Sequence, residues 1–187
     1  KYDWISLFMK KTYLNDIKQK ELSVHEANIG YYKIFNHLIL PYMLKSDIEF
    51  WTRIQCSQVF QVEKQGSRGY LFYDNFFILN YCLTTDIHDI SIYESELNFS
   101  VSKKLTDSQI KSYAFNEIIF FLTRYKGVLN LVDCYQQLKR QLSEDDCIRL
   151  FNSVKLTTKV FVNLIGLSEA GYYNSHRKTP LEESYDE

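Results

Sequence analysis

Hydrophobic and polar positions change their period along the chain, and these changes divide it into three regions. Up to about residue 44 the spacing is helical, with Trp4 and Phe8 on the first predicted helix. A second predicted helix has apolar residues at three- and four-residue intervals and is bent or ended near Pro41. Its apolar positions are Tyr31, Ile34, Phe35, Leu38, Ile39 and Tyr42.

From Ile48 the period becomes two, which predicts a strand that continues to about residue 63. The segment 65–69 contains two glycines and predicts a turn. The aromatic run 70–83 would then return as the partner strand of a hairpin. Apolar residues occupy even positions at Ile90 and Ile92 but odd positions from Leu97 to Val101. This change indicates further short strands on either side of a bulge or turn near Glu94.

Helical signals resume at Thr106. The threonine hydroxyl and the side chain of Gln109 have the spacing of a capping box, which marks the start of a helix. The helix should run to Gly127, whose position suits a C-terminal stop. Its sequence is apolar on nearly every side. It is therefore either a central core helix or the seam of a dimer, and the core interpretation is favoured.

A second C-terminal helix is predicted over 128–142, and Ser143 would cap a third whose first turn holds three acidic residues. The order of elements predicts an α+β protein with N-terminal helices, a small antiparallel sheet and a C-terminal helical bundle. We expect a sensing or oligomerisation region at 1–104, a helical region at 105–180 and an acidic tail at 181–187.

The segment 157–178 predicts two short helices joined by a tight turn, the arrangement of a helix-turn-helix. Gly166 can adopt the left-handed backbone that ends the first helix, and the hydroxyl of Ser168 can cap the second. The inward side chains of the first helix would be Val160, Phe161, Leu164 and Ile165, and those of the second would be Leu167 and Tyr172.

The outward side chains of the second helix would then face DNA. Tyr173, Asn174 and Arg177 are predicted to contact bases or phosphates, since a recognition helix presents such groups to the major groove. Lys159 and Lys178 are predicted phosphate contacts. Ala170 would also lie on this face. The predicted DNA-binding set is Lys159, Ser168 as the cap, Tyr173, Asn174, Arg177 and Lys178.

The same segment resembles known DNA-binding motifs. Gly166-Leu167-Ser168, followed by Gly171-Tyr172-Tyr173 and the basic pair Arg177-Lys178, is similar to the first helix-turn-helix of insertion-sequence transposases. The layout of the whole chain resembles helix-turn-helix regulators of bacteria. That resemblance implies double-stranded DNA as a partner. A symmetric homodimer would favour this interpretation, because its two recognition helices would match successive major grooves. No trio of carboxylates matches a transposase metal site. Gly171 lies inside the predicted recognition helix, where a glycine destabilises the helix by about 1 kcal/mol relative to alanine.

Charge limits the kind of nucleic-acid binding. The net charge of −1 argues against a protein that coats nucleic acid, because nonspecific affinity comes mainly from an excess of Lys and Arg. The segment 155–178 is nevertheless locally basic, with Glu169 as its single acid. The tail carries several acids after Pro180 and would either repel phosphate or, as is more usual at a chain end, stay in solvent.

The four cysteines show no spacing that resembles a zinc site, and we expect buried thiols in a cytoplasmic protein. Neither a signal peptide nor a membrane-spanning run is expected, and no metal or cofactor is predicted. The chain does not begin with methionine, which is compatible with a fragment of a longer protein.

Signals for catalysis are poor. Asp86, His88 and Asp89 could bind a metal or move a proton, but neighbouring strand positions alternate faces, so a surface turn is favoured. The predicted function is therefore a DNA-binding transcriptional regulator without catalysis. The alternative is a protein-interaction module, because the aromatic residues between 70 and 81 exceed what one hairpin face can bury.

Overall fold

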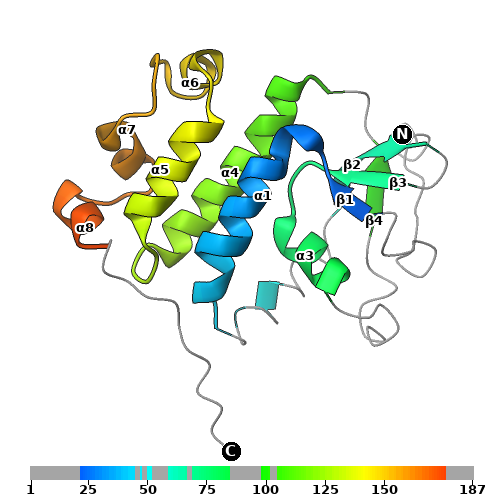
Figure 1. Cartoon of the computed structure of the whole chain (residues 1–187), viewed down its shortest axis with the longest axis horizontal. Coiled ribbons are helices and arrows are strands. Elements are labelled where there is room, and N and C mark those ends of the chain that lie inside the picture. Colours follow the sequence, from blue (N-terminus) through cyan, green and yellow to red (C-terminus); the bar gives the residue numbers. More distant parts are fainter. Residues whose placement is uncertain are drawn as a thin grey trace, which may run out of the picture. The chain divides into compact units, whose positions relative to one another are not determined.

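The computed structural model describes residues 22–44, 47, 50–51, 59–66, 69–84, 98–101 and 105–175. These form an α+β structure, as predicted (Figure 1). Contacts divide the chain into two compact units. The first unit comprises Lys1–Ile29 and Lys45–Ala114, and the second comprises Gly30–Leu44 and Phe115–Glu187. Residues 30–44, which the sequence groups with the first region, therefore belong to the helical unit.

The first unit contains a four-stranded sheet in the order β1-β3-β2-β4. The hairpin of β2 (Val59–Gln65) and β3 (Gly69–Phe72) is antiparallel and has the predicted turn. β1 (Leu22–Val24) pairs in parallel with β3, and β4 (Asn98–Val101) pairs in parallel with β2. The sheet is thus mixed, and the prediction of an antiparallel sheet was wrong. A three-residue strand is too short to show a period, and its partner lies far along the chain.

Two other strand predictions were wrong. Phe50 and Trp51, which lie within the predicted strand, are helical, and residues 52–58 lie outside the described part. The aromatic run forms β3 and then, after Asn75 with φ 59°, the helix α3 (Phe76–Thr84). A continuous apolar run fits a buried helix as well as a buried strand, so periodicity could not separate them. The described aromatic side chains Phe72, Tyr73, Phe76 and Phe77 are buried in this unit.

The predicted second helix is confirmed but is not a regular α-helix. It follows the 3₁₀ turn η4 (Glu26–Asn28) and consists of α1 (Ile29–Ile34), the π-helical segment η5 (Phe35–Ile39) and the 3₁₀ turn η6 (Leu40–Tyr42). The helix ends in the turn that contains Pro41, as expected. Five of the six predicted apolar positions are buried: Tyr31, Ile34, Phe35, Ile39 and Tyr42.

The second unit contains most of α4 (Asp107–Tyr125) together with α5 (Leu131–Gln141), α6 (Glu144–Phe151), α7 (Thr158–Leu164) and α8 (Glu169–Asn174). The expected caps are present at the starts of α4 and α6. Phe35 of η5 packs on Phe121 of α4, and the backbone at Gly30 lies against the side chain of Gln141. These contacts join α1 and η5 to α4 and α5.

Helix α4 has one buried face, so the expectation of a helix that is apolar nearly all round was wrong. Phe115, Ile118 and Leu122 are buried. Phe120 is exposed, and its neighbours one helical turn away, Asn116, Thr123 and Arg124, are exposed polar residues. The buried face supports the interpretation of α4 as a core helix. Among the described helices, none combines the length and hydrophobicity that crossing a membrane requires.

Candidate nucleic-acid interface

Helix α7 is the first helix of the predicted pair. The Thr157 hydroxyl accepts a hydrogen bond from the amide of Val160 and so caps the helix. Phe161 and Ile165 are buried, as predicted. Leu164, however, is 38% exposed, and Val162 is buried in its place. The inward face is therefore formed by Phe161, Val162 and Ile165, whose spacing of one and four residues places them on one side of the helix.

The turn after α7 is held by its own backbone and by Lys126, which lies in the connection between α4 and α5. Gly166 has φ 62°, the left-handed conformation that the sequence predicted. The Lys126 ammonium donates hydrogen bonds to the carbonyls of Ile165 at 3.0 Å and Gly166 at 2.7 Å. A cation at a helix C-terminus also interacts favourably with the helix dipole. Sequence reasoning missed Lys126, since nothing local relates it to a turn about 40 residues later.

Helix α8 is fixed at both ends. At its start the Ser168 hydroxyl accepts a hydrogen bond from the amide of Gly171 at 3.2 Å, which confirms the predicted cap. At its end the buried hydroxyl of Ser175 accepts from the amide of Leu131 at 2.9 Å and donates to the carbonyl of Tyr172 at 2.7 Å. Ser175 thus ties the end of α8 to the first turn of α5.

Three aromatic rings, one from each helix, join α5, α7 and α8. The ring centroids of Tyr135 and Phe161 are 5.4 Å apart, and each lies 5.9 Å from Tyr172. The rings are tilted or edge-on, the arrangement that aromatic quadrupoles prefer. Burial raises the pKa of Tyr172 to about 12, so its hydroxyl is neutral at physiological pH. We call these three residues the aromatic triangle.

Gly171 has a packing role that the sequence did not reveal. A Cβ atom at this position would lie 3.1 Å from Leu167 Cδ1 and 3.2 Å from Leu167 Cγ. The glycine therefore lets the Leu167 side chain lie close to the first turn of α8. This close approach explains why a residue of low helix propensity occupies the helix.

The described members of the predicted outward face are exposed. Tyr173 is 57% exposed, and its ring stands edge-on against Tyr172 at 5.0 Å. Asn174 is exposed on α8, and Lys159 is exposed on α7. Ser168 is the cap described above. Arg177 and Lys178 lie outside the described residues.

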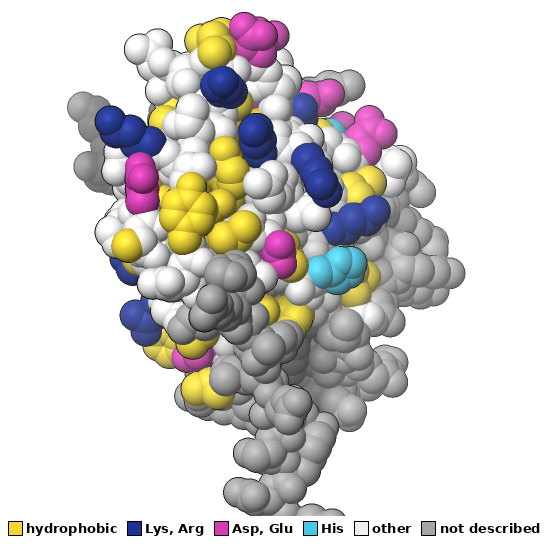
Figure 2. Space-filling model, turned by 60° about the vertical axis from the view of Figure 1, so that its left-hand side comes forward, with side chains coloured by type: hydrophobic (Ala, Val, Ile, Leu, Met, Phe, Trp, Pro, Cys, Tyr) yellow, Lys and Arg dark blue, Asp and Glu magenta, His cyan; other side chains and the backbone are white. Residues whose placement is uncertain are grey.

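The charge of the described part of the second unit is basic. It contains eight Lys or Arg and six Asp or Glu residues. Figure 2 looks from the side on which Figure 1 draws α6, α7 and α8, and there Lys and Arg side chains, with some Asp and Glu among them, lie around a group of hydrophobic side chains. The exposed acids of α5 to α8 are Asp133, Glu144, Asp145 and Glu169. The exposed basic residues of α5 to α7 and their connections are Lys139, Arg140, Arg149, Lys155 and Lys159.

The cysteines and the possible metal ligands give no sign of a reactive site in the described part of the chain. Cys134 and Cys147 are buried free thiols, as expected. Burial raises the pKa of both, that of Cys134 to about 12, so both stay protonated at neutral pH. Cys56 and the side chain of Cys82 lie outside the described part, as do Asp86, His88 and Asp89. Within the described residues, no three His, Cys, Asp or Glu side chains form a group that could hold a metal ion.

Comparisons with known proteins add no family to this picture: no protein-family model matches the chain, and neither curated proteins nor solved structures gave a match.

Proposed function

We propose that the chain is a DNA-binding transcriptional regulator without catalysis, which contacts double-stranded DNA through the outward face of α7 and α8. The observation that carries this proposal is the fixed position of α8. The aromatic triangle, the Ser168 cap and the Ser175 bond hold a six-residue helix in one place. Such a short helix would not be stable alone, and its outer side chains are presented on a rigid support.

The chemistry of that outer face suits duplex DNA. Asn174 can form paired hydrogen bonds with adenine, and Tyr173 can contact a phosphate or a thymine methyl group. Lys159 is exposed on the preceding helix and can neutralise a phosphate. A helix of six residues reaches few bases, so phosphate contacts from neighbouring basic residues must supply much of the affinity.

The alternative of a protein-interaction module loses part of its original support. That interpretation rested on an excess of aromatic side chains between 70 and 81. In the structure Phe72, Tyr73, Phe76 and Phe77 are at most 2% exposed and belong to the interior of the first unit. Tyr70 is half-buried, and the side chain of Tyr81 lies outside the described part.

Binding of the purified chain to a mixed-sequence duplex at two salt concentrations tests the proposal. We expect binding that weakens as salt rises, and a slope of log K against log salt that is smaller by about 0.9 for Lys159→Ala. Lys33→Ala is the matched control, because Lys33 is an exposed base on α1, which is not part of the proposed interface. Absence of duplex binding at low salt, or equal loss in both variants, would contradict the proposal.

A further inference from the structure

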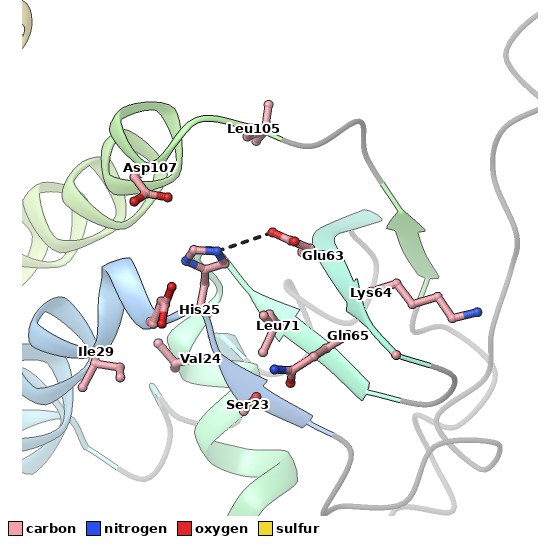
Figure 3. Close-up of a pocket in the computed structure, with 12 residues that line it drawn as sticks. Ser23, Val24, His25, Ile29, Glu63, Lys64, Gln65, Leu71, Leu105 and Asp107 are labelled. Atoms are coloured by element: carbon pink, nitrogen blue, oxygen red, sulfur yellow. Dashed lines mark ion pairs between the residues drawn. The ribbon is translucent and has the colours of Figure 1, made fainter.

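A cavity in the first unit lies against one face of the sheet. Its volume is about 550 Å³ (Figure 3). Ser23, Leu71 and Glu63 are paired in register across β1, β3 and β2, so their side chains share one face of the sheet and line the cavity. Leu105 and Asp107, at the start of α4, line it from another side. The volume is in the range of small-molecule sites.

A buried histidine faces this cavity. His25 is only 7% exposed, and its Nδ1 atom accepts a hydrogen bond from the amide of Ala27 at 3.2 Å. In the neutral ring the proton is therefore on Nε2, which lies 3.4 Å from Oε2 of Glu63 (Figure 3). That separation is longer than an ordinary N–H···O hydrogen bond. Glu63 is thus a weakly bound partner of Nε2, and an oxygen atom of a ligand in the cavity can compete with it for the Nε2 proton.

The charges around the cavity favour a cation. Glu26, Glu63 and Asp107 all line it. Among the described lining residues, Lys64 is the one lysine or arginine; it follows Glu63 in β2 and so faces the other side of the sheet, and Figure 3 shows its ammonium directed away from His25. The carboxylates therefore create a negative potential, which disfavours phosphates and carboxylates as ligands.

The size and lining exclude a bare metal ion as the natural occupant. No three acidic or imidazole groups among the described residues come close enough to coordinate one ion. The wall also includes apolar side chains, among them Ile29, which is 45% exposed, and Leu71. A ligand that fills such a site has an organic body as well as a positive charge.

We propose that this cavity binds a small organic cation that also carries hydroxyl groups, with amino sugars and amino alcohols as its ligand class. The ammonium group is bound by the carboxylates of Glu63 and Asp107. A hydroxyl oxygen accepts the Nε2 proton of His25, and Ser23 and Gln65 serve other hydroxyls. Carbon atoms of the ligand lie over Leu71 and Ile29. This binding does not depend on the proposed contact with DNA.

Calorimetric titration of the full chain with glucosamine tests the proposal. Glucose is the matched ligand without the ammonium group, and magnesium chloride tests for a simple cation site. We expect saturable binding of glucosamine, and binding that is at least about tenfold weaker for glucose, because a charged hydrogen bond is lost. Equal affinity for glucose, a magnesium response that displaces glucosamine, or no saturable binding of glucosamine would overturn the proposal.

Three variants locate the site. Glu63→Gln and Asp107→Asn keep the side-chain shapes and remove one charge each, and we expect each to weaken glucosamine binding by about tenfold. Glu144→Gln removes an exposed acid of α6, in the second unit, and should leave the affinity unchanged. Circular dichroism shows whether each variant is folded. Unchanged affinity in both folded cavity variants would contradict the assignment.

Discussion

Asp74 makes the stability of this chain depend on pH. Burial raises the pKa of its carboxyl from the ordinary 3.8 to about 6, although Asn75 Nδ2 donates a hydrogen bond to it at 2.6 Å and opposes the shift. The folded state therefore holds a proton that the unfolded chain releases between about pH 4 and 6. The free energy of unfolding must fall as pH rises through that interval.

Asp74→Asn removes this dependence. We expect the variant to be more stable than the parent above pH 6 by about 1–2 kcal/mol, with the difference vanishing near pH 4. Urea denaturation at pH 4 and pH 7.5 measures both values. An advantage that is the same at both pH values would show that the carboxyl does not titrate as described.

A second residue-scale prediction concerns Gly166. Its φ of 62° is unfavourable for any residue with a Cβ atom, so Gly166→Ala should lower the free energy of unfolding by about 1 kcal/mol. Gly127→Ala is the control, since its added Cβ would meet no atom within 4 Å. Urea denaturation compares the two. Equal effects would mean that backbone conformation at Gly166 does not hold the turn.

At the scale of elements, the aromatic triangle should be the main support of α8. Phe161→Ala removes a fully buried ring and is expected to cost about 3–5 kcal/mol, and it should also release α8. Tyr173→Ala, on the exposed side of the same pair of helices, is the control and should cost under about 1 kcal/mol. Hydrogen exchange of the α8 amides reports the loss of support. Protected α8 amides in folded Phe161→Ala would contradict this role.

The same scale shows what the sequence could predict. Caps and turns depend on neighbouring residues, so Ser143, Gly166 and Ser168 were assigned correctly. The prediction of element type was wrong at α3, because a short apolar run fits a buried helix as well as a buried strand. It missed β1, because a strand of three residues depends on a partner that is distant in the chain. Lys126 and the cavity could not be found, since both arise from residues that are far apart in the chain.

At the scale of the whole molecule, we propose a different function for each of the two units. The first contains the cavity proposed to bind a hydroxylated amine, and the second presents the proposed DNA-binding face. If the first unit senses such a ligand for the second, glucosamine should change duplex affinity, and the duplex should change glucosamine affinity by the same factor. Titration of each in the presence of the other measures this coupling. Unchanged affinities in both titrations would contradict coupled binding.

The most direct test of the central proposal is a map of amide chemical shifts during titration of the chain with duplex DNA. Contact through α7 and α8 predicts the largest changes at Lys159 and from Ser168 to Asn174, with small changes in the sheet of the first unit. Binding with its largest changes elsewhere, or no change at low salt, would contradict the assignment of this face to DNA.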